Sequence, residues 1–568
     1  MQRYDHTKYR VFKTVDKADR RWPDRTILQA PQWCSVDLRD GNQALIEPMT
    51  PMQKLRMFEM LVSVGFKQIE VGFPAASQPD FDFVRKLIEE DLVPDDVTIQ
   101  VLTQAREPLI NRSFEALRGA KQAIMHLYNS TSTVQREQVF KLSREEIKQI
   151  AVNGATWVKT AAGKFPDTQW QFQYSPESFT GTELDYAVEV CNAVGEVWQP
   201  TPEHKIIFNL PATVEVATPN VYADQIEWFC DNIEKRDSII ISLHTHNDRG
   251  CGVAASELGV LAGADRVEGT LLGNGERTGN MDIVTMGMNL YSQGVEPRLD
   301  FSHMDQIIHV VESCTQLKVH PRHPYAGELV FAAFSGSHQD AINKCLAMHK
   351  DGEPWEVAYL PIDPRDLGRN YQEVIRINSQ SGKGGVAYIL DQEHGIKMPR
   401  WLQVDFSRVV QREAERTETE VNGKQLYGLF SDTYLLSKEP TSRATNSMCI
   451  ESYQVSRADG LDTVNALITQ GNHEHQIIGS GRGALEAFMD GLSLHLGIRF
   501  VIIDYSEHTL GKNEGSEAMA YVQISIENQR LCGVGQSRDI LNASVNAVLS
   551  AVTRSGITSI KQELKFGT

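Results

Sequence analysis

The sequence lacks the patterns that mark secreted, membrane-bound and nucleic-acid-binding proteins. None of its eight cysteines forms a CxxC pair, so neither a disulfide framework nor a cysteine-ligated zinc site is expected. No apolar run approaches the length of a membrane helix, and the charged N-terminus has no apolar stretch typical of a secretory signal. The formal net charge of -18 argues against nucleic acid or an anionic membrane as a partner. We therefore expect a cytoplasmic protein with no nucleic-acid and no membrane partner.

What the sequence does contain is a regular alternation of apolar and amphipathic segments. The apolar runs are mostly continuous, as expected for parallel strands covered on both faces. They occupy Cys34–Asp40, Lys67–Pro74, Thr98–Thr103, Ala123–Asn129, Gln169–Glu177, Lys205–Glu215, Ile239–Asp248 and Asp265–Glu276. Their number predicts a (β/α)8 TIM barrel, and a doubly wound sheet is the alternative. The barrel is favoured because reactive residues follow several of these strands, where barrel active sites lie.

The length of 568 residues exceeds what one hydrophobic core usually supports, so several domains are expected. We expect an N-terminal extension (1–30), the α/β barrel (31–320), small α/β linking subdomains (321–427) and a C-terminal α+β domain (428–568). The last region contains HEHQIIGSGRGALEAFMDGLSLHL and QRLCGVGQSRDILNASVNAVLSAV, each read as a strand, a Gly-x-Gly turn and a helix. Two such copies predict a pseudo-symmetric domain, unless the glycines mark nothing more than tight turns.

The segment ISLHTHNDRGCG is the strongest indication of a metal site. His244 and His246 are separated by one residue at the end of an apolar run, so both imidazoles point to the same face of a strand. Nitrogen ligands combined with carboxylate or amide oxygens suit Zn²⁺, Mn²⁺ or a related divalent ion such as Mg²⁺. Taken alone, the pair is equally compatible with two histidines that bind no metal.

Two further segments favour the metal. VDLRDGNQAL ends the first strand with Arg39 and Asp40, and GTLLGNGERTGN follows the eighth with Glu276 and Asn280. In a closed barrel the first, seventh and eighth strands are neighbours, so Asp40 and Asn280 can converge on the two histidines. The glycines of GNGERTGN do not have dinucleotide-binding spacing and follow the last strand, so we reject a dinucleotide site.

Together LRDGNQAL, HTHND and GNGERTGN resemble the DRE-TIM metallolyase superfamily. LRDGNQAL, FNLPATVE, YSPE, GNGERTGN, SGSHQDAI and YLPIDPRDLGR resemble its long-type 2-isopropylmalate synthase family. The resemblance extends from about Ile27 to the C-terminus. Many superfamily members have Glu after LRDG, whereas Asn42 stands here, as in the long synthases.

The resemblance implies a Claisen condensation of acetyl-CoA with 2-oxoisovalerate, followed by thioester hydrolysis to 2-isopropylmalate. It also implies a divalent metal, a homodimer and feedback inhibition by leucine, and it leaves open whether K⁺ is an activator. Arg39 is expected to stabilise the developing alkoxide and Glu70 to orient Arg39. The implied base for the acetyl methyl is His338, from the partner subunit.

The remaining site residues are implied by the same resemblance. Glu177 and Glu276 are the acids expected to assist the base or the hydrolytic water, and their roles cannot be separated. Tyr371 matches a second residue of the linking region near the site. The 2-oxo acid would contact His126, Ser175, Asn209, Pro211, Thr213 and Leu102, although Leu102 also suits the plain barrel core. Backbone NH groups near Gly481, Gly483, Gly533 and Gly535 would hold the leucine carboxylate.

Other functions remain open from the sequence. Citramalate synthase would need a narrower slot, and homocitrate synthase an additional cation for the distal carboxylate. Hydroxymethylglutaryl-CoA lyases have a cysteine in the loop after strand eight, which GNGERTGN lacks. A barrel that has lost catalysis and senses an amino acid is disfavoured by the intact polar set.

Overall fold

The computed structural model describes residues 5–333, 335–369, 383–417, 421, 423–436, 448–470, 473–510, 517–526 and 529–556. Its contacts divide the chain into two compact units. The first comprises Met1–Val330 with Arg365–Arg369, and the second comprises Phe331–Pro364 with Asn370–Thr568. No helix among the described residues is both long enough and apolar enough to span a bilayer.

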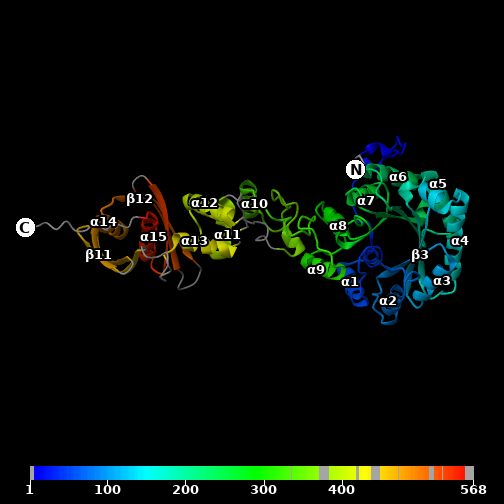
Figure 1. Ribbon diagram of the computed structural model, residues 1–568, viewed down its shortest axis with the longest axis horizontal. Helices are drawn as coiled ribbons and strands as arrows, with labels where there is room; N and C mark the ends of the chain where they lie inside the picture. The colour runs from blue at the N-terminus through cyan, green and yellow to red at the C-terminus, as the bar shows by residue number, and fades with distance from the viewer. Residues whose placement is uncertain are drawn as a thin grey trace, which may run out of the picture. The chain divides into compact units, whose positions relative to one another are not determined.

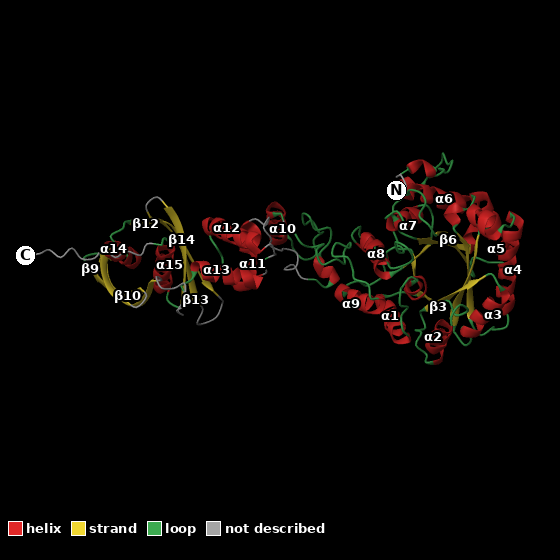
Figure 2. Ribbon diagram, in the orientation of Figure 1, coloured by secondary structure: helices red, strands yellow, loops and turns green. Residues whose placement is uncertain are grey.

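The first unit is a TIM barrel, as the sequence predicted. Eight parallel strands close into a barrel in sequence order, and β1 pairs with β8 through Trp33 and Val267. This closure excludes a doubly wound sheet. Figure 2 shows the strands as the inner ring and the helices around them. The strands are Gln32–Ser35 (β1), Gln68–Gly72 (β2), Thr98–Gln104 (β3), Gln122–Ser130 (β4), Gln169–Glu177 (β5), Ile206–Ala212 (β6), Ile239–Thr245 (β7) and Arg266–Gly269 (β8).

Local sequence signals explain where the surrounding helices begin and end. Helix α1 begins with a capping box formed by Thr50 and Gln53, has Pro51 in its first turn and ends at Gly65 with φ of 110°. Figure 1 shows these helices around the strands. They are Pro51–Val64 (α1), Gln78–Glu89 (α2), Glu107–Ala116 (α3), Arg144–Ala162 (α4), Leu184–Trp198 (α5), Pro219–Asn232 (α6), Gly252–Leu261 (α7) and Ile283–Tyr291 (α8). A further helix, Met304–Thr315 (α9), packs against α1 outside this ring.

Two of the expected strands end much earlier than predicted. Strand β1 stops at Ser35, and Asp37–Gly41 forms a turn of π-helix. Strand β8 stops at Gly269, well before Glu276. In both places the apolar pattern continues beyond the last residue that pairs with a neighbouring strand. The residues that follow form loops at the end of the barrel. The polar residues of these segments therefore lie on loops at the barrel mouth.

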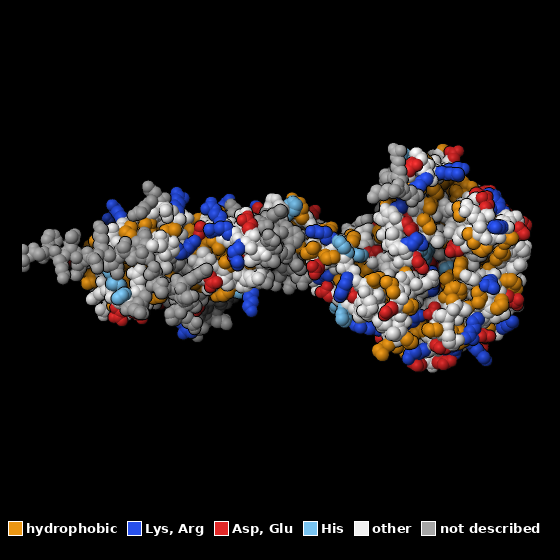
Figure 3. Space-filling model, viewed as in Figure 1, with side chains coloured by type: hydrophobic (Ala, Val, Ile, Leu, Met, Phe, Trp, Pro, Cys, Tyr) orange, Lys and Arg blue, Asp and Glu red, His pale blue; other side chains and the backbone are white. Residues whose placement is uncertain are grey.

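The expected N-terminal extension packs against α6. Arg20 Nε donates to Asp224 Oδ1 at 2.7 Å, and the indole NH of Trp22 donates to the same oxygen at 2.9 Å. Lys17 Nζ donates to Asp231 Oδ2 at 2.7 Å. Charges of both signs are interspersed on the barrel face seen in Figure 3, as on an ordinary solvated surface.

The second unit contains two copies of one motif, three antiparallel strands followed by a helix. The sheets have the orders β11-β10-β9 and β12-β13-β14, and α14 and α15 pack in one core with both sheets. The strands are Met448–Ala458 (β9), Leu461–Gln470 (β10), His473–Gly481 (β11), Phe500–Leu510 (β12), Glu517–Ile526 (β13) and Gln529–Ser537 (β14). The helices are Gly336–Met348 (α10), Lys383–His394 (α11), Arg400–Thr417 (α12), Gly423–Tyr434 (α13), Ala484–Leu496 (α14) and Ile540–Arg554 (α15).

The expected boundary between residues 427 and 428 falls inside α13. Helices α11 to α13 share a buried cluster with Met519, Tyr521 and Val534 of β13 and β14. The second sheet is therefore covered by α15 on one face and by these helices on the other, so the linking region and the C-terminal domain share a core.

The interpretation of the glycine pairs as turns was wrong. Gly479 and Gly481 lie in β11, and Gly533 and Gly535 lie in β14. A Cβ on Gly533 would lie 2.1 Å from Ala547 O, and one on Gly535 would lie 2.0 Å from Ala543 O. The glycines let each helix approach its sheet closely, which is a packing requirement and not a turn.

This packing gives a paired prediction. Gly535→Ala should lower the free energy of unfolding by about 3 kcal/mol, at the upper end of the range for overpacked cores, because the two nearest atoms are backbone atoms of α15. Gly483→Ala is the control, since Gly483 has an extended φ of -151° and a Cβ there would meet nothing within 4 Å. Urea unfolding of both variants measures the difference, and equal midpoints would contradict this account.

Candidate active site

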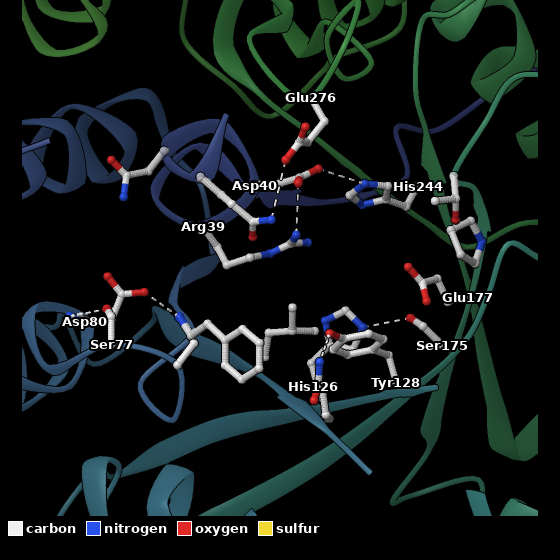
Figure 4. A pocket seen from close by; sticks show the side chains of 18 of the residues that line it. Arg39, Asp40, Ser77, Asp80, His126, Tyr128, Ser175, Glu177, His244 and Glu276 are labelled. Carbon is white, nitrogen blue, oxygen red and sulfur yellow. Dashed lines mark hydrogen bonds and ion pairs between the residues drawn. The ribbon is translucent and has the colours of Figure 1, made fainter. Parts of the chain in front are cut away.

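A pocket of about 820 Å³ opens at the carboxyl ends of the barrel strands. Figure 4 shows Arg39 lying between Asp40 on one side and His126 on the other. Most of the residues expected in the site line this pocket, and they come from seven of the strands or the loops after them. They are Arg39, Asp40, Leu102, His126, Ser175, Glu177, Asn209, Pro211, Thr213, His244, His246 and Glu276.

Asp40, His244 and His246 form the metal cluster at the pocket wall. Their ligand atoms all lie within 4.8 Å of one another, and all three side chains are buried. Asp40 Oδ2 lies 3.2 Å from His244 Nε2 and 3.6 Å from His246 Nε2. A β-bridge between His246 and Asn280 brings the fourth expected ligand to the same place.

Unpaired acceptors show that the cluster suits a cation. Asp40 Oδ2 and Asn280 Oδ1 are buried, and neither accepts a hydrogen bond from any described residue. Buried polar atoms without a partner are rare in folded proteins and call for an explanation such as a bound ion. Two imidazole nitrogens, a carboxylate and an amide oxygen are ligands that a borderline divalent cation accepts.

Burial and neighbouring charges shift the pKa values of the three side chains in the cluster. Burial alone would raise the pKa of Asp40, but Arg39 and His244 outweigh it and hold this pKa well below its usual range. Burial lowers the pKa of His244, yet the adjacent carboxylates of Asp40 and Glu268 raise the value to about 9. Burial and the adjacent His244 lower the pKa of His246 to about 4. Asp40 therefore stays ionised and available to a cation.

A chain of hydrogen bonds continues from Arg39 along the pocket floor. Arg39 donates to Glu70, as expected from the sequence, and its Nη1 lies 3.0 Å from Asp40 Oδ1. Glu70 Oε2 lies 2.7 Å from His126 Nδ1, and His126 Nε2 lies 2.7 Å from Ser175 Oγ. Arg39 and His126 keep the pKa of Glu70 low despite its burial. The guanidinium is thus fixed with its terminal nitrogens beside the metal cluster.

The remaining expected residues stand around the pocket rim. Ser130 donates to Glu177, and Gln43 Nε2 lies 3.5 Å from Glu276 Oε1. Thr213 Oγ1 accepts a bond from Ser178 N at 3.0 Å. Glu177 ends strand β5 and Glu276 lies on the loop after β8, and both line the pocket.

Some expected residues are not in the barrel. His338 lies on α10 in the second unit, where its ring stacks on Tyr359 at 4.0 Å between centroids. Tyr371 lies outside the described residues. Gly481, Gly533 and Gly535 are strand residues and Gly483 is the N-cap of α14, so their role in effector binding stays a prediction.

Sequence reasoning missed Tyr128 and a buried polar layer below the pocket. The Tyr128 hydroxyl accepts a bond from Gln104 at 2.9 Å, and its ring packs edge-on against Phe73. The layer consists of Gln100, Gln173, Arg266 and Glu268, all with no exposed surface. The signal was present, because polar residues at alternate positions of apolar strands point into the barrel.

Fold and site together define a class: a metal-dependent TIM-barrel enzyme whose chemistry takes place at the carboxyl end of the barrel. Three family models match the chain: "HMGL-like" over residues 30–311, "Alpha-isopropylmalate synthase, post-catalytic domain-like" over 328–391 and "LeuA allosteric (dimerisation) domain" over 420–555.

Full-length relatives agree with these matches. The 2-isopropylmalate synthase of Pseudomonas entomophila is 56% identical, covering 96% of this chain and 97% of its own. That of Alcanivorax borkumensis is 55% identical over 98% of both chains. Among solved structures, hydroxymethylglutaryl-CoA lyase of Pseudomonas aeruginosa has a TM-score of 0.42 and 16% identity, covering 51% of this chain and 95% of its own. The chain belongs to the 2-isopropylmalate synthase family.

Proposed function

We propose that this protein condenses acetyl-CoA with 2-oxoisovalerate and hydrolyses the thioester, giving 2-isopropylmalate and CoA. The observation that carries the proposal is the Asp40, His244, His246 and Asn280 cluster beside Arg39, in a pocket of a chain that belongs to this family. The reaction would commit carbon to leucine synthesis in the cytoplasm.

The cluster would hold Mg²⁺, Mn²⁺ or Zn²⁺, and the bound ion would act as a Lewis acid on the 2-oxo carbonyl. Arg39 stabilises the negative charge that develops on the carbonyl oxygen when the new carbon–carbon bond forms, because its guanidinium is fixed by Glu70 next to Asp40. Preorganised donors of this kind need no rearrangement during the reaction. The role of Glu70 is therefore to keep Arg39 in place.

The acetyl methyl must lose a proton before it attacks, and a base has to be positioned for this step. We assign that base to His338 of the partner subunit in a homodimer. Glu177 and Glu276 line the pocket and would assist the base or activate the water that releases the thiol. Tyr371 is the second residue that we assign to the site from the linking region.

The acceptor would bind on the floor and the far wall of the pocket. Thr213 would hydrogen-bond the carboxylate, and His126, Ser175 and Asn209 would form the floor. Leu102 and Pro211 offer apolar surface for the branched side chain. The pocket cations Arg39, Lys54 and Arg277 are paired with Glu70, Asp80 and Asp248 respectively, which disfavours an acceptor with a second carboxylate.

The C-terminal repeat would bind leucine as a feedback inhibitor. The match to an allosteric, dimerisation domain supports both this role and the homodimer. Gly481, Gly483, Gly533 and Gly535 remain the proposed effector region, and K⁺ is proposed as an activator of the barrel.

Thiol release from acetyl-CoA tests the proposed function directly. 2-Oxoisovalerate, pyruvate and 2-oxoglutarate are compared, with and without a chelator, and leucine is added to the most active mixture. We expect clear preference for 2-oxoisovalerate, loss of activity on chelation, recovery with a divalent ion and a lower rate with leucine. Preference for pyruvate or 2-oxoglutarate would change the acceptor, and no release with any acceptor would refute the condensation.

A further inference from the structure

Glu268 joins the metal cluster to the interior of the barrel. It lies on β8 directly opposite His244 of β7 in the strand register, and it has no exposed surface. Its Oε2 lies 2.8 Å from His244 Nδ1. Because a carboxylate only accepts, this contact places a proton on Nδ1 and directs Nε2 toward Asp40 and His246.

Both carboxylate oxygens of Glu268 are held in place. Arg266 Nη1 donates to Oε1 at 2.7 Å, and Gln173 Nε2 donates to the same oxygen at 2.8 Å. Asn209 Nδ2 donates to Oε2 at 3.3 Å. Rotation of the carboxylate would break several bonds at once, so its orientation is fixed before any ligand binds.

Arg266 is anchored independently of the metal site. It has no exposed surface, donates to Ser242 Oγ at 2.8 Å and donates to Gln100 Oε1 at 2.9 Å. Below this layer Ile124, Ile207 and Ile240 form an apolar cluster. A charged pair in such low-dielectric surroundings interacts strongly, which stiffens the whole layer.

The two histidines of the cluster differ in whether a carboxylate holds the Nδ1 atom of the ring. His246 Nδ1 is buried and has no hydrogen-bond partner among the described residues, whereas His244 Nδ1 is held by Glu268. Carboxylates that bind the outer nitrogen of a metal-ligating histidine fix its tautomer and increase its basicity. Only one of the two imidazoles is therefore preorganised through a carboxylate.

We propose that Glu268, anchored by Arg266 and Gln173, is a positioning residue that holds His244 ready to bind the metal. It does not touch the reacting atoms. The role rests on the metal site of the proposed function and is independent of which 2-oxo acid reacts. It also gives a reason for the charged pair in a barrel core that is usually filled by branched apolar side chains.

Metal binding by the full-length chain, without substrates, tests this role. After chelator treatment, each variant is titrated with Zn²⁺ against a chromophoric chelator, and the visible spectrum of the Co²⁺-loaded protein is recorded. Glu268→Gln should weaken Zn²⁺ binding by roughly 10- to 100-fold and change the Co²⁺ spectrum, the usual cost of losing such a partner. Unchanged affinity and spectrum in the folded variant would overturn the proposal.

Glu227→Gln is the matched control. Glu227 is also a fully buried carboxylate, but it lies on α6 and accepts from Arg21 N at 3.1 Å. The Glu227→Gln variant should have a lower free energy of unfolding and an unchanged affinity for Zn²⁺. A similar loss of metal affinity in this control would show a general effect of losing a buried charge and would overturn the proposal.

A second variant provides the test if Glu268→Gln does not fold. Replacing both partners, as Arg266→Met with Glu268→Gln, leaves no unpaired charge in the core and is expected to fold better. Weak Zn²⁺ binding by this double variant supports the role, and wild-type binding contradicts it. Because no acetyl-CoA is present, the result is separate from whether the condensation occurs.

Discussion

Asp40→Ala should abolish tight metal binding and lower turnover by at least about 10³-fold, the scale of several kcal/mol of charge stabilisation that a catalytic metal contributes. The carboxylate gives the cluster its negative charge, and Oδ2 is a buried acceptor with no hydrogen-bond partner in the described part of the chain. Its loss would also leave Arg39 with Glu70 as its remaining partner. Equilibrium dialysis against Zn²⁺ and the thiol assay measure both effects.

Asp96→Ala provides the comparison for that variant. Asp96 is 67% exposed and pairs with Lys67, so its removal should change neither metal content nor rate. If Asp40→Ala retained one tightly bound ion and normal turnover, the assignment of the metal ligands would be wrong.

His338→Ala should lower kcat by about 10²- to 10⁴-fold with little change in metal binding, the usual contribution of a general base. His349→Ala is the control, because His349 also lies beside an aromatic ring, that of Trp355, and has no proposed role. The rates of both variants are compared at saturating acetyl-CoA and 2-oxoisovalerate. Full turnover by His338→Ala would refute the base.

Mixed dimers decide whether the base comes from the partner subunit. A dimer of one Asp40→Ala chain and one His338→Ala chain would contain one intact site if the base acts across the interface. Co-expression of the two chains should then restore roughly a quarter of wild-type activity, since half of randomly assembled dimers are mixed. If the base acts within its own chain, both sites remain broken and no activity returns.

Much of the barrel and its metal ligands could be predicted from local sequence patterns. Mostly continuous apolar runs marked all eight strands because parallel strands of a barrel are buried on both faces. His244 and His246 could be paired because a strand repeats every two residues. The ends of two strands, at Ser35 and Gly269, were predicted too far along the chain. The sequence alone does not distinguish an apolar residue in a loop from one in a strand.

The sequence by itself therefore determined which segments alternate as strand and helix, and which polar residues follow the strands. Only the tertiary structure decided that Arg39 pairs with Glu70, that Glu268 holds His244, and that Gly535 lies against α15. These outcomes depend on which strand is neighbour to which and in what register. Local periodicity reports burial within a few residues of chain, whereas such contacts join residues far apart, and their geometry is fixed only when the barrel closes and the helices pack.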